Sequence, residues 1–216
     1  MVEQLGNNQA PVRHGGLYAL EQRAQNNPRL RQTVVDIICA YLRMPWTPPQ
    51  EEDRQIRTAQ RAARTRPRGR AETRAGRDPA EERHVRLTAH LNWSRLRRWW
   101  WRSGPVFWHG IHLDLGDATL LNFSFNGCRV DWANFNRASF LGDTYFGFAN
   151  FDQEATFRWA TFNGLTLFVE VEGPVYLSGA RVMHPAARVP GADTSGSLQR
   201  GGIRSGCLKP VGSRPC

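Results

Sequence analysis

A five-residue period in the C-terminal half of this 216-residue chain constrains its fold more than any other feature. From residue 115 onward every fifth residue is large and apolar, with one-residue insertions after residues 140 and 151. The residue two places before each of these centres is mostly small, often alanine. The predicted inward-facing centres are Leu115, Leu120, Phe125, Val130, Phe135, Phe140, Phe146, Phe151, Phe157, Phe162 and Leu167.

A period of five fits neither an α-helix, which repeats about every 3.6 residues, nor a simple strand, which repeats every ~2 residues. The chain must therefore turn at regular intervals while it presents two residues in every five to an interior. A square solenoid meets this requirement, because its stacked coils hydrogen-bond roughly 4.8 Å apart like neighbouring strands. Asn126-Gly127 and Asn163-Gly164 fall at its corners, where unusual backbone angles are needed.

The strings ANFNRASF, ANFDQEATF and ATFNG resemble pentapeptide-repeat proteins, whose A-(N/D/T)-(L/F)-x-x units build a right-handed quadrilateral β-helix. The resemblance covers residues 113–167 and resumes over 175–182. Between these ranges it breaks, because Glu172 falls on a predicted centre. Four units per coil over residues 113–167 imply a short solenoid of fewer than three coils.

Residues 11–44 predict a helical hairpin. The apolar stripe of its first helix consists of Val12, Leu17, Leu20 and Ala24. Asn27 then serves as an N-cap with Pro28 at the first helical position, and Met44-Pro45 ends the second helix. The apolar stripe of that second helix consists of Val34, Ile38, Tyr41 and Leu42.

The N-terminal half is similar to one bacterial subgroup of the pentapeptide-repeat family. Strings like VEQLG, VRHGGLYALE, TVVDIICAYLR, VRLTA and FW-x-G-I-x-L-D-L precede the repeats in that subgroup, and all of them occur here. Longer relatives often carry membrane-spanning helices upstream, so the resemblance implies a truncated member, and membrane association follows by analogy alone. The chain itself has no apolar run near the ~18 residues of a membrane span and no signal-peptide h-region, which favours a soluble cytoplasmic protein.

The net charge of +10 is concentrated in one segment. Residues 54–102 hold 15 arginines and four acids, a balance of +11, whereas residues 109–182 hold four arginines and eight acids, a balance of −4. Two interpretations stay open for the Arg- and Trp-rich part of this segment. The tryptophans cap the open end of the solenoid, or the segment contacts phosphates or an anionic membrane. The second interpretation rests on Arg95, Arg97, Arg98, Trp99, Trp100, Trp101 and Arg102.

The sequence offers no catalytic or metal-binding pattern. His109, His112 and Asp114 lack the spacing of a recognised metal site, and the four cysteines form no C-x-x-C pair. Cys128 occupies a small inward slot and is predicted to be a core residue. No nucleophile elbow, phosphate loop or dinucleotide fingerprint is present, so no enzyme activity, cofactor or metal is expected.

These observations predict an α+β protein in five parts. They are a helical hairpin (1–45), an Arg-rich and partly disordered linker (46–84), a short helix with a Trp-rich junction (85–108), a pentapeptide-repeat β-helix (109–184) and a disordered tail (185–216). The expected function is a non-catalytic scaffold that contacts an unknown protein partner, with no small-molecule substrate. The solenoid end is also a candidate homodimer contact.

The same residues are compatible with two other functions. The alternative function is peripheral binding of nucleic acid or an anionic membrane through residues 54–102. The resemblance also brings in a family activity, in which some pentapeptide-repeat proteins mimic duplex DNA and protect type II topoisomerases. That activity suits a long, strongly acidic rod, so it is disfavoured for a short solenoid with a charge of −4.

Overall fold

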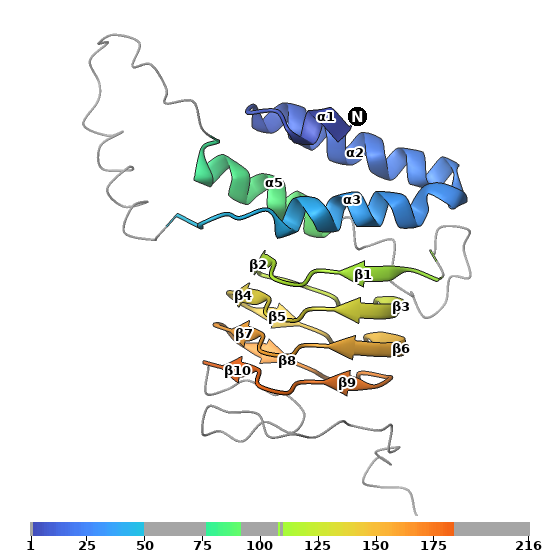
Figure 1. Ribbon diagram of the computed structural model, residues 1–216, viewed down its shortest axis with the longest axis vertical. Helices are drawn as coiled ribbons and strands as arrows, with labels where there is room; N and C mark the ends of the chain where they lie inside the picture. The colour runs from blue at the N-terminus through green and yellow to red at the C-terminus, as the bar shows by residue number, and fades with distance from the viewer. Residues whose placement is uncertain (1, 50–76, 92–107, 109, 184–216) are drawn as a thin grey trace, which may run out of the picture.

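The computed structural model describes residues 2–49, 77–91, 108 and 110–183. A helical part is followed by a parallel β-solenoid (Figure 1), as the repeat predicts. The described helices are α1 (Val2–Leu5), α2 (Ala10–Asn26), the 3-10 helix η1 (Pro28–Leu30), α3 (Arg31–Arg43) and α5 (Pro79–Leu91).

The solenoid strands form three parallel sheets that wrap around one interior. The first sheet contains β1 (His112–Asp114), β3 (Arg129–Asn134), β6 (Asn150–Thr156) and β9 (Val175–Tyr176), in that order. The second contains β2 (Thr119–Leu121), β4 (Ser139–Leu141), β7 (Thr161–Phe162) and β10 (Arg181–Val182). The third pairs β5 (Thr144–Tyr145) with β8 (Thr166–Leu167).

The aromatic centres of successive coils stack directly on one another. Phe135 lies 4.7 Å from Phe157, and Phe140 lies 4.6 Å from Phe162, with each pair of rings nearly parallel. These ring separations match the roughly 4.8 Å between hydrogen-bonded strands, so the strand spacing itself places each ring in contact with the next. Ten of the eleven predicted centres, all except Leu167, are buried.

The frame of the repeat changes after Phe162, and here the sequence prediction was wrong. Leu167 is half-buried on the outside, and Phe168 stacks on Phe146 at 4.6 Å in its place. The corner after Phe162 carries an extra residue, just as the corner above it does between Phe140 and Phe146. Leucines occupy positions 165 and 167, which are the inward positions of the unshifted five-residue frame. The sequence therefore hides the extra residue, which moves the inward position from 167 to 168.

The repeat resumes after the break, within the range 175–182 where the sequence predicts it. Glu172 is exposed, and Gly173 takes the next position in the column below Phe151. A Cβ at Gly173 would lie 2.0 Å from the Phe151 carbonyl oxygen, so the close backbone approach admits only glycine. β9 and β10 then add a fourth strand to two of the sheets, which gives about four turns rather than fewer than three.

Two corners of each coil are tight turns with a left-handed residue. Ala118 N–H donates to Leu115 C=O at 3.2 Å, and Asp117 between them has φ 60°. This is the pattern of a type II turn, which requires a positive φ at its third residue. The left-handed residues at these two corners stack in two columns, Asp117, Arg137, Trp159 and Gly179 at one corner and Gly127, Phe148 and Glu170 at the other. Asn122 and Gly142, which are also left-handed, stack at a further corner.

α3 follows the predicted pattern closely. The Asn27 side chain accepts a hydrogen bond from Arg29 N–H and so caps η1, which continues into α3. Val34, Ile38, Tyr41 and Leu42 are all buried, and the helix ends at Arg43 before Met44-Pro45. The stripe of α2 agrees less well, because Val12 is only half-buried while the neighbouring Arg13 is fully buried.

The helices close the first coil of the solenoid. α3 and α5 lie across the β1 and β2 end, with α2 behind them (Figure 1). The Gln32 side chain extends β1 like a short strand, since its amide donates to His112 C=O and accepts from His112 N–H, both at 2.9 Å. These bonds satisfy backbone groups of an edge strand that pairs with no other described strand on that side.

Candidate interaction surface

The outer face of the first sheet is polar, and its side chains satisfy one another. Asn134 donates to Asp114 at 2.8 Å, and the Trp132 indole N–H donates to Glu154 at 3.0 Å. His112 packs edge-on against Trp132. Because these side chains already form hydrogen bonds along the stack, few donors and acceptors remain for a partner. The polar residues of this face therefore stabilise the solenoid.

The outer face of the third sheet has the opposite character. Its outward side chains form what we call the apolar strip, made of Tyr145, Phe148, Leu165, Leu167 and Val169. The register holds these residues together, because Tyr145 pairs with Leu167 and Phe148 N–H donates to Val169 C=O at 2.8 Å. Phe148 is 63% exposed and Val169 is 41% exposed. The strip is thus a contiguous apolar surface in contact with solvent.

Phe148 stands out in this strip because its backbone is left-handed. Its φ is 55°, whereas the equivalent corner one coil above is formed by Gly127 with φ 64°. A bulky side chain in this region costs free energy that glycine or asparagine largely avoids. Because Phe148 is also mostly exposed, it gains little burial in return, and folding alone does not account for a phenylalanine here.

Acidic side chains border the apolar strip. Asp143 and Glu170 are exposed at its margins, and neither forms an ion pair with a described residue. Glu172 is also exposed, but it lies beside Asn150, whose side chain donates to it, and it interacts electrostatically with Arg129. Asp143 accepts hydrogen bonds from the Leu165 N–H at 3.2 Å and from the Tyr145 hydroxyl at 3.3 Å. Partial burial and the Asp143 carboxylate raise the pKa of Tyr145. The strip therefore combines apolar contact area with uncompensated negative charge.

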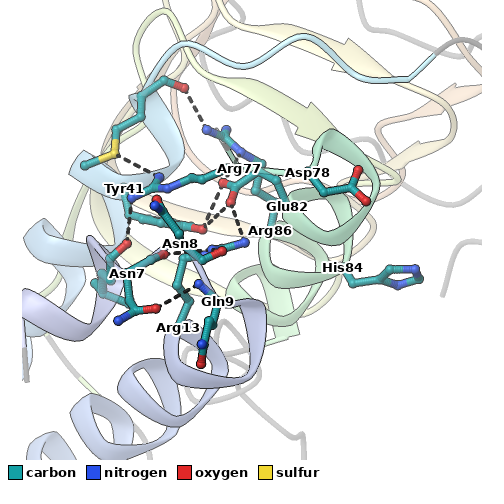
Figure 2. A network of polar contacts seen from close by, with 12 residues as sticks. Asn7, Asn8, Gln9, Arg13, Tyr41, Arg77, Asp78, Glu82, His84 and Arg86 are labelled. Atoms are coloured by element: carbon teal, nitrogen blue, oxygen red, sulfur yellow. Dashed lines mark hydrogen bonds and ion pairs between the residues drawn. The ribbon is translucent and has the colours of Figure 1, made fainter. Parts of the chain in front are cut away.

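A second cluster of polar side chains lies buried among the helices (Figure 2). The Glu82 carboxylate on α5 is bonded from three sides: the Tyr41 hydroxyl at 2.8 Å, Arg86 Nε at 3.0 Å and Arg13 Nη2 at 3.3 Å. All four side chains are almost completely buried. The cluster joins α2, α3 and α5 around one negative charge and two positive charges.

The geometry of this cluster indicates a structural role. Arg86 uses its remaining nitrogens on the carbonyl groups of Leu42 and Met44, at 2.8 and 2.7 Å, and so caps the C-terminal end of α3. Burial and the Glu82 carboxylate raise the pKa of Tyr41, which keeps its hydroxyl protonated as a donor. A pocket of about 330 Å³ borders Trp46, Arg77, Glu82 and Arg86, but Arg86 has its donors occupied within the protein.

The other residues considered from the sequence fall into three groups. Cys128 is buried in its small inward slot, as predicted. His112 packs on Trp132, while Asp114 binds Arg43 and Asn134; His109 lies outside the described residues. The proposed anionic-surface contacts (Arg95, Arg97, Arg98, Trp99, Trp100, Trp101 and Arg102) also lie outside them, and so does the tryptophan cap. Within the described ranges, no three ligand-type side chains gather closely enough to hold a metal ion.

Sequence reasoning did not find the apolar strip or the buried cluster. A signal for the strip was present, because Leu165, Leu167 and Val169 alternate with Thr166 and Phe168, so apolar residues occupy both the inward and the outward positions. Comparison of the chain with family models, curated proteins and solved structures found no match. None of the described helices has the length and apolar character needed to cross a membrane.

Proposed function

We propose that this protein is a non-catalytic interaction module that binds a protein partner through the apolar strip. The observation that carries the proposal is the exposed, left-handed Phe148 within a contiguous apolar surface. Exposed apolar patches with polar or charged margins are typical of protein-binding sites. The stacked interior serves to hold this surface rigid, since its aromatic centres interlock from coil to coil.

We also propose that the solenoid is a right-handed quadrilateral β-helix of the pentapeptide-repeat family. Two features support this assignment. Alanine recurs in the small inward slots, as at Ala133, Ala138 and Ala155, and large apolar centres follow two residues later. The strand register advances by 20 to 22 residues per coil, close to four five-residue units. The coil supplies the scaffold, and the outward residues supply the function.

Site-specific photo-crosslinking in the native host tests the binding proposal. A photoreactive phenylalanine analogue at position 148 should form an adduct with a partner protein. The same analogue at position 159 is the matched control, because Trp159 is similarly exposed (61%) with φ 56° but belongs to the other corner column. Adducts at both positions alike, or at neither, would contradict the proposed binding face.

A further inference from the structure

We infer that the apolar strip binds a short, arginine-rich partner segment that also carries apolar side chains. The inference rests on the proposed function and adds the chemistry of the partner. It starts from the combination found at this face: two aromatic rings, three aliphatic side chains and two marginal carboxylates, Asp143 and Glu170, that form no ion pair with a described residue.

The size of the strip indicates a short segment rather than a second folded domain. Its two neighbouring chain segments, 143–148 and 165–169, cover roughly 10 Å by 17 Å at the usual strand spacing and rise per residue. Stable interfaces between folded proteins bury roughly 800 Å² on each partner, several times this footprint. A peptide of a few residues matches the available surface, and alternate side chains of an extended peptide would face the strip.

The charge of the strip specifies the sign of the partner. Asp143 and Glu170 lie at its margins without an ion-pair partner among the described residues. The solenoid as a whole also carries an excess of acids, with eight against four arginines over residues 109–182. A cationic segment would gain attraction at these margins, whereas an acidic segment would be repelled.

The aromatic content of the strip favours arginine over lysine. The ring of Phe148 is exposed and that of Tyr145 is half-buried, and both lie beside marginal carboxylates. A guanidinium group stacks on an aromatic ring and can bond a carboxylate in the same position, while an ammonium group is a compact, strongly hydrated charge. We therefore expect arginine to be preferred where ring and carboxylate are adjacent, as at Tyr145 and Asp143.

The inference is tested with four labelled eight-residue peptides and the full-length chain, by fluorescence anisotropy. The peptides consist of four Arg-Leu, four Lys-Leu, four Glu-Leu or four Arg-Ser repeats. The Arg-Leu peptide should bind best, at least about tenfold more tightly than the Glu-Leu and Arg-Ser peptides and severalfold more tightly than the Lys-Leu peptide. Its affinity should fall by roughly tenfold between 0.05 and 0.5 M salt, since the marginal charges are exposed.

Three variants locate the binding on the chain. Phe148→Asn should weaken Arg-Leu binding about tenfold without loss of fold, because asparagine tolerates the left-handed backbone. The double variant Asp143→Asn, Glu170→Gln should remove most of the salt dependence. Trp159→Asn, the matched control at the other corner, should bind like the wild type.

Several results would overturn the inference. Equal affinity for the Arg-Leu and Arg-Ser peptides would show that charge alone is responsible. Equal loss of binding in Phe148→Asn and Trp159→Asn would place the contact elsewhere. A gain of more than tenfold on replacing residues 95–102 by Gly and Ser would show that the chain's own segment occupies the strip. A crosslinked partner at position 148 without an arginine-rich segment would overturn this inference while the proposed function stands.

Discussion

Phe148 and Gly127 occupy equivalent corners in successive coils, yet they meet the same backbone requirement at different cost. Glycine adopts a positive φ without a steric penalty, whereas phenylalanine adopts it at a steric cost because of its Cβ. The same contrast appears between Trp159 and Gly179 in the other column, where the Trp159 indole covers Gly179 closely enough that a Cβ there would lie 2.6 Å away. Trp159 thus has a packing role below it, whereas the residue below Phe148 in its column is the exposed Glu170.

Replacing Phe148 by asparagine should leave the stability of the protein unchanged or raise it. We expect the free energy of unfolding to rise by up to about 1 kcal/mol, because asparagine lowers the cost of the left-handed backbone and little burial is lost. Urea denaturation followed by circular dichroism measures the change. Phe148→Leu, which keeps a bulky side chain in that conformation, is the control and should show no gain. A loss above 1 kcal/mol in Phe148→Asn would mean that the ring stabilises the fold.

Cys39 gives the protein a sensitivity to alkaline pH. Burial raises the pKa of the Cys39 thiol to about 12, from an ordinary value of 9.0. Because this pKa is raised in the folded state, the stabilisation that the neutral thiol contributes is fully present below pH 9 and is lost as the pH rises towards 12. The free energy of unfolding should fall by about 3 kcal/mol over that range on account of this thiol, which is 1% exposed.

Cys39→Ala tests this sensitivity. The variant lacks the titrating thiol, so its stability should fall less steeply than that of the wild type between pH 9 and pH 12. Cys128 also lies in the core and its variant Cys128→Ala serves as the comparison, since alanine is the usual residue of its slot. Parallel pH curves for Cys39→Ala and the wild type would show that the thiol does not carry the effect.

At the scale of the element, buried charge decides how the helices pack. α2 and α5 are joined through Arg13 and Glu82, and α3 joins both through Tyr41 and the carbonyl groups that Arg86 caps. Breaking a buried ion pair by removing one partner is costly, because the other charge stays buried without compensation. Glu82 is the only acid in the cluster, so both arginines depend on it.

Glu82→Gln should destabilise the helical part by about 3 kcal/mol, since it leaves two buried guanidinium groups without a counter-charge. Thermal unfolding followed at 222 nm measures the loss. Glu81→Gln, at the exposed neighbouring position of the same helix, is the matched control and should change stability by less than about 0.5 kcal/mol. Similar effects of the two substitutions would contradict the assigned role of the buried cluster.

At the scale of the whole molecule, the helices and the solenoid behave as one folded unit. α3 contacts β1 and β2, and α5 contacts β2, so the first coil is covered by helices along its end. Gln32 and Arg43 attach α3 to β1 through His112 and Asp114. The exposed end of a parallel stack would otherwise present unpaired backbone groups, which natural sheets protect by such covers.

Gln32→Ala should open this edge. It removes both bonds to His112, so the amide hydrogen of His112 should exchange with solvent roughly tenfold faster, corresponding to about 1.4 kcal/mol of lost protection. Native-state hydrogen exchange by NMR measures it. Thr33→Ala, at the exposed next position of α3, should leave the rate unchanged. Unchanged His112 exchange in Gln32→Ala would show that the edge is protected by other groups.

The sequence by itself determined the solenoid and the local character of α3. A residue of the solenoid faces inward because of its position within the five-residue repeat, so this local periodicity predicts directly that Phe135 and Ala138 are buried. The Asn27-Pro28 start of the second helix is also a local signal. The frame failed only at Phe168, where outward leucines hid an inserted residue. The apolar strip was missed for the same reason, because Leu165 and Leu167 were assigned to inward positions although Thr166 and Phe168 occupy those positions.

Only the tertiary structure decided which surfaces meet. The bond between Tyr41 and Glu82 joins residues 41 apart, and the Gln32 bonds to His112 span 80 residues. No local period encodes such pairs, because they depend on how whole elements pack rather than on which side of an element a residue lies. Arg13 shows this most clearly, since a charged residue beside an apolar stripe is expected at the surface. It is buried here because Glu82 lies opposite and because the carbonyl groups of Asn7 and Asn8 accept hydrogen bonds from it.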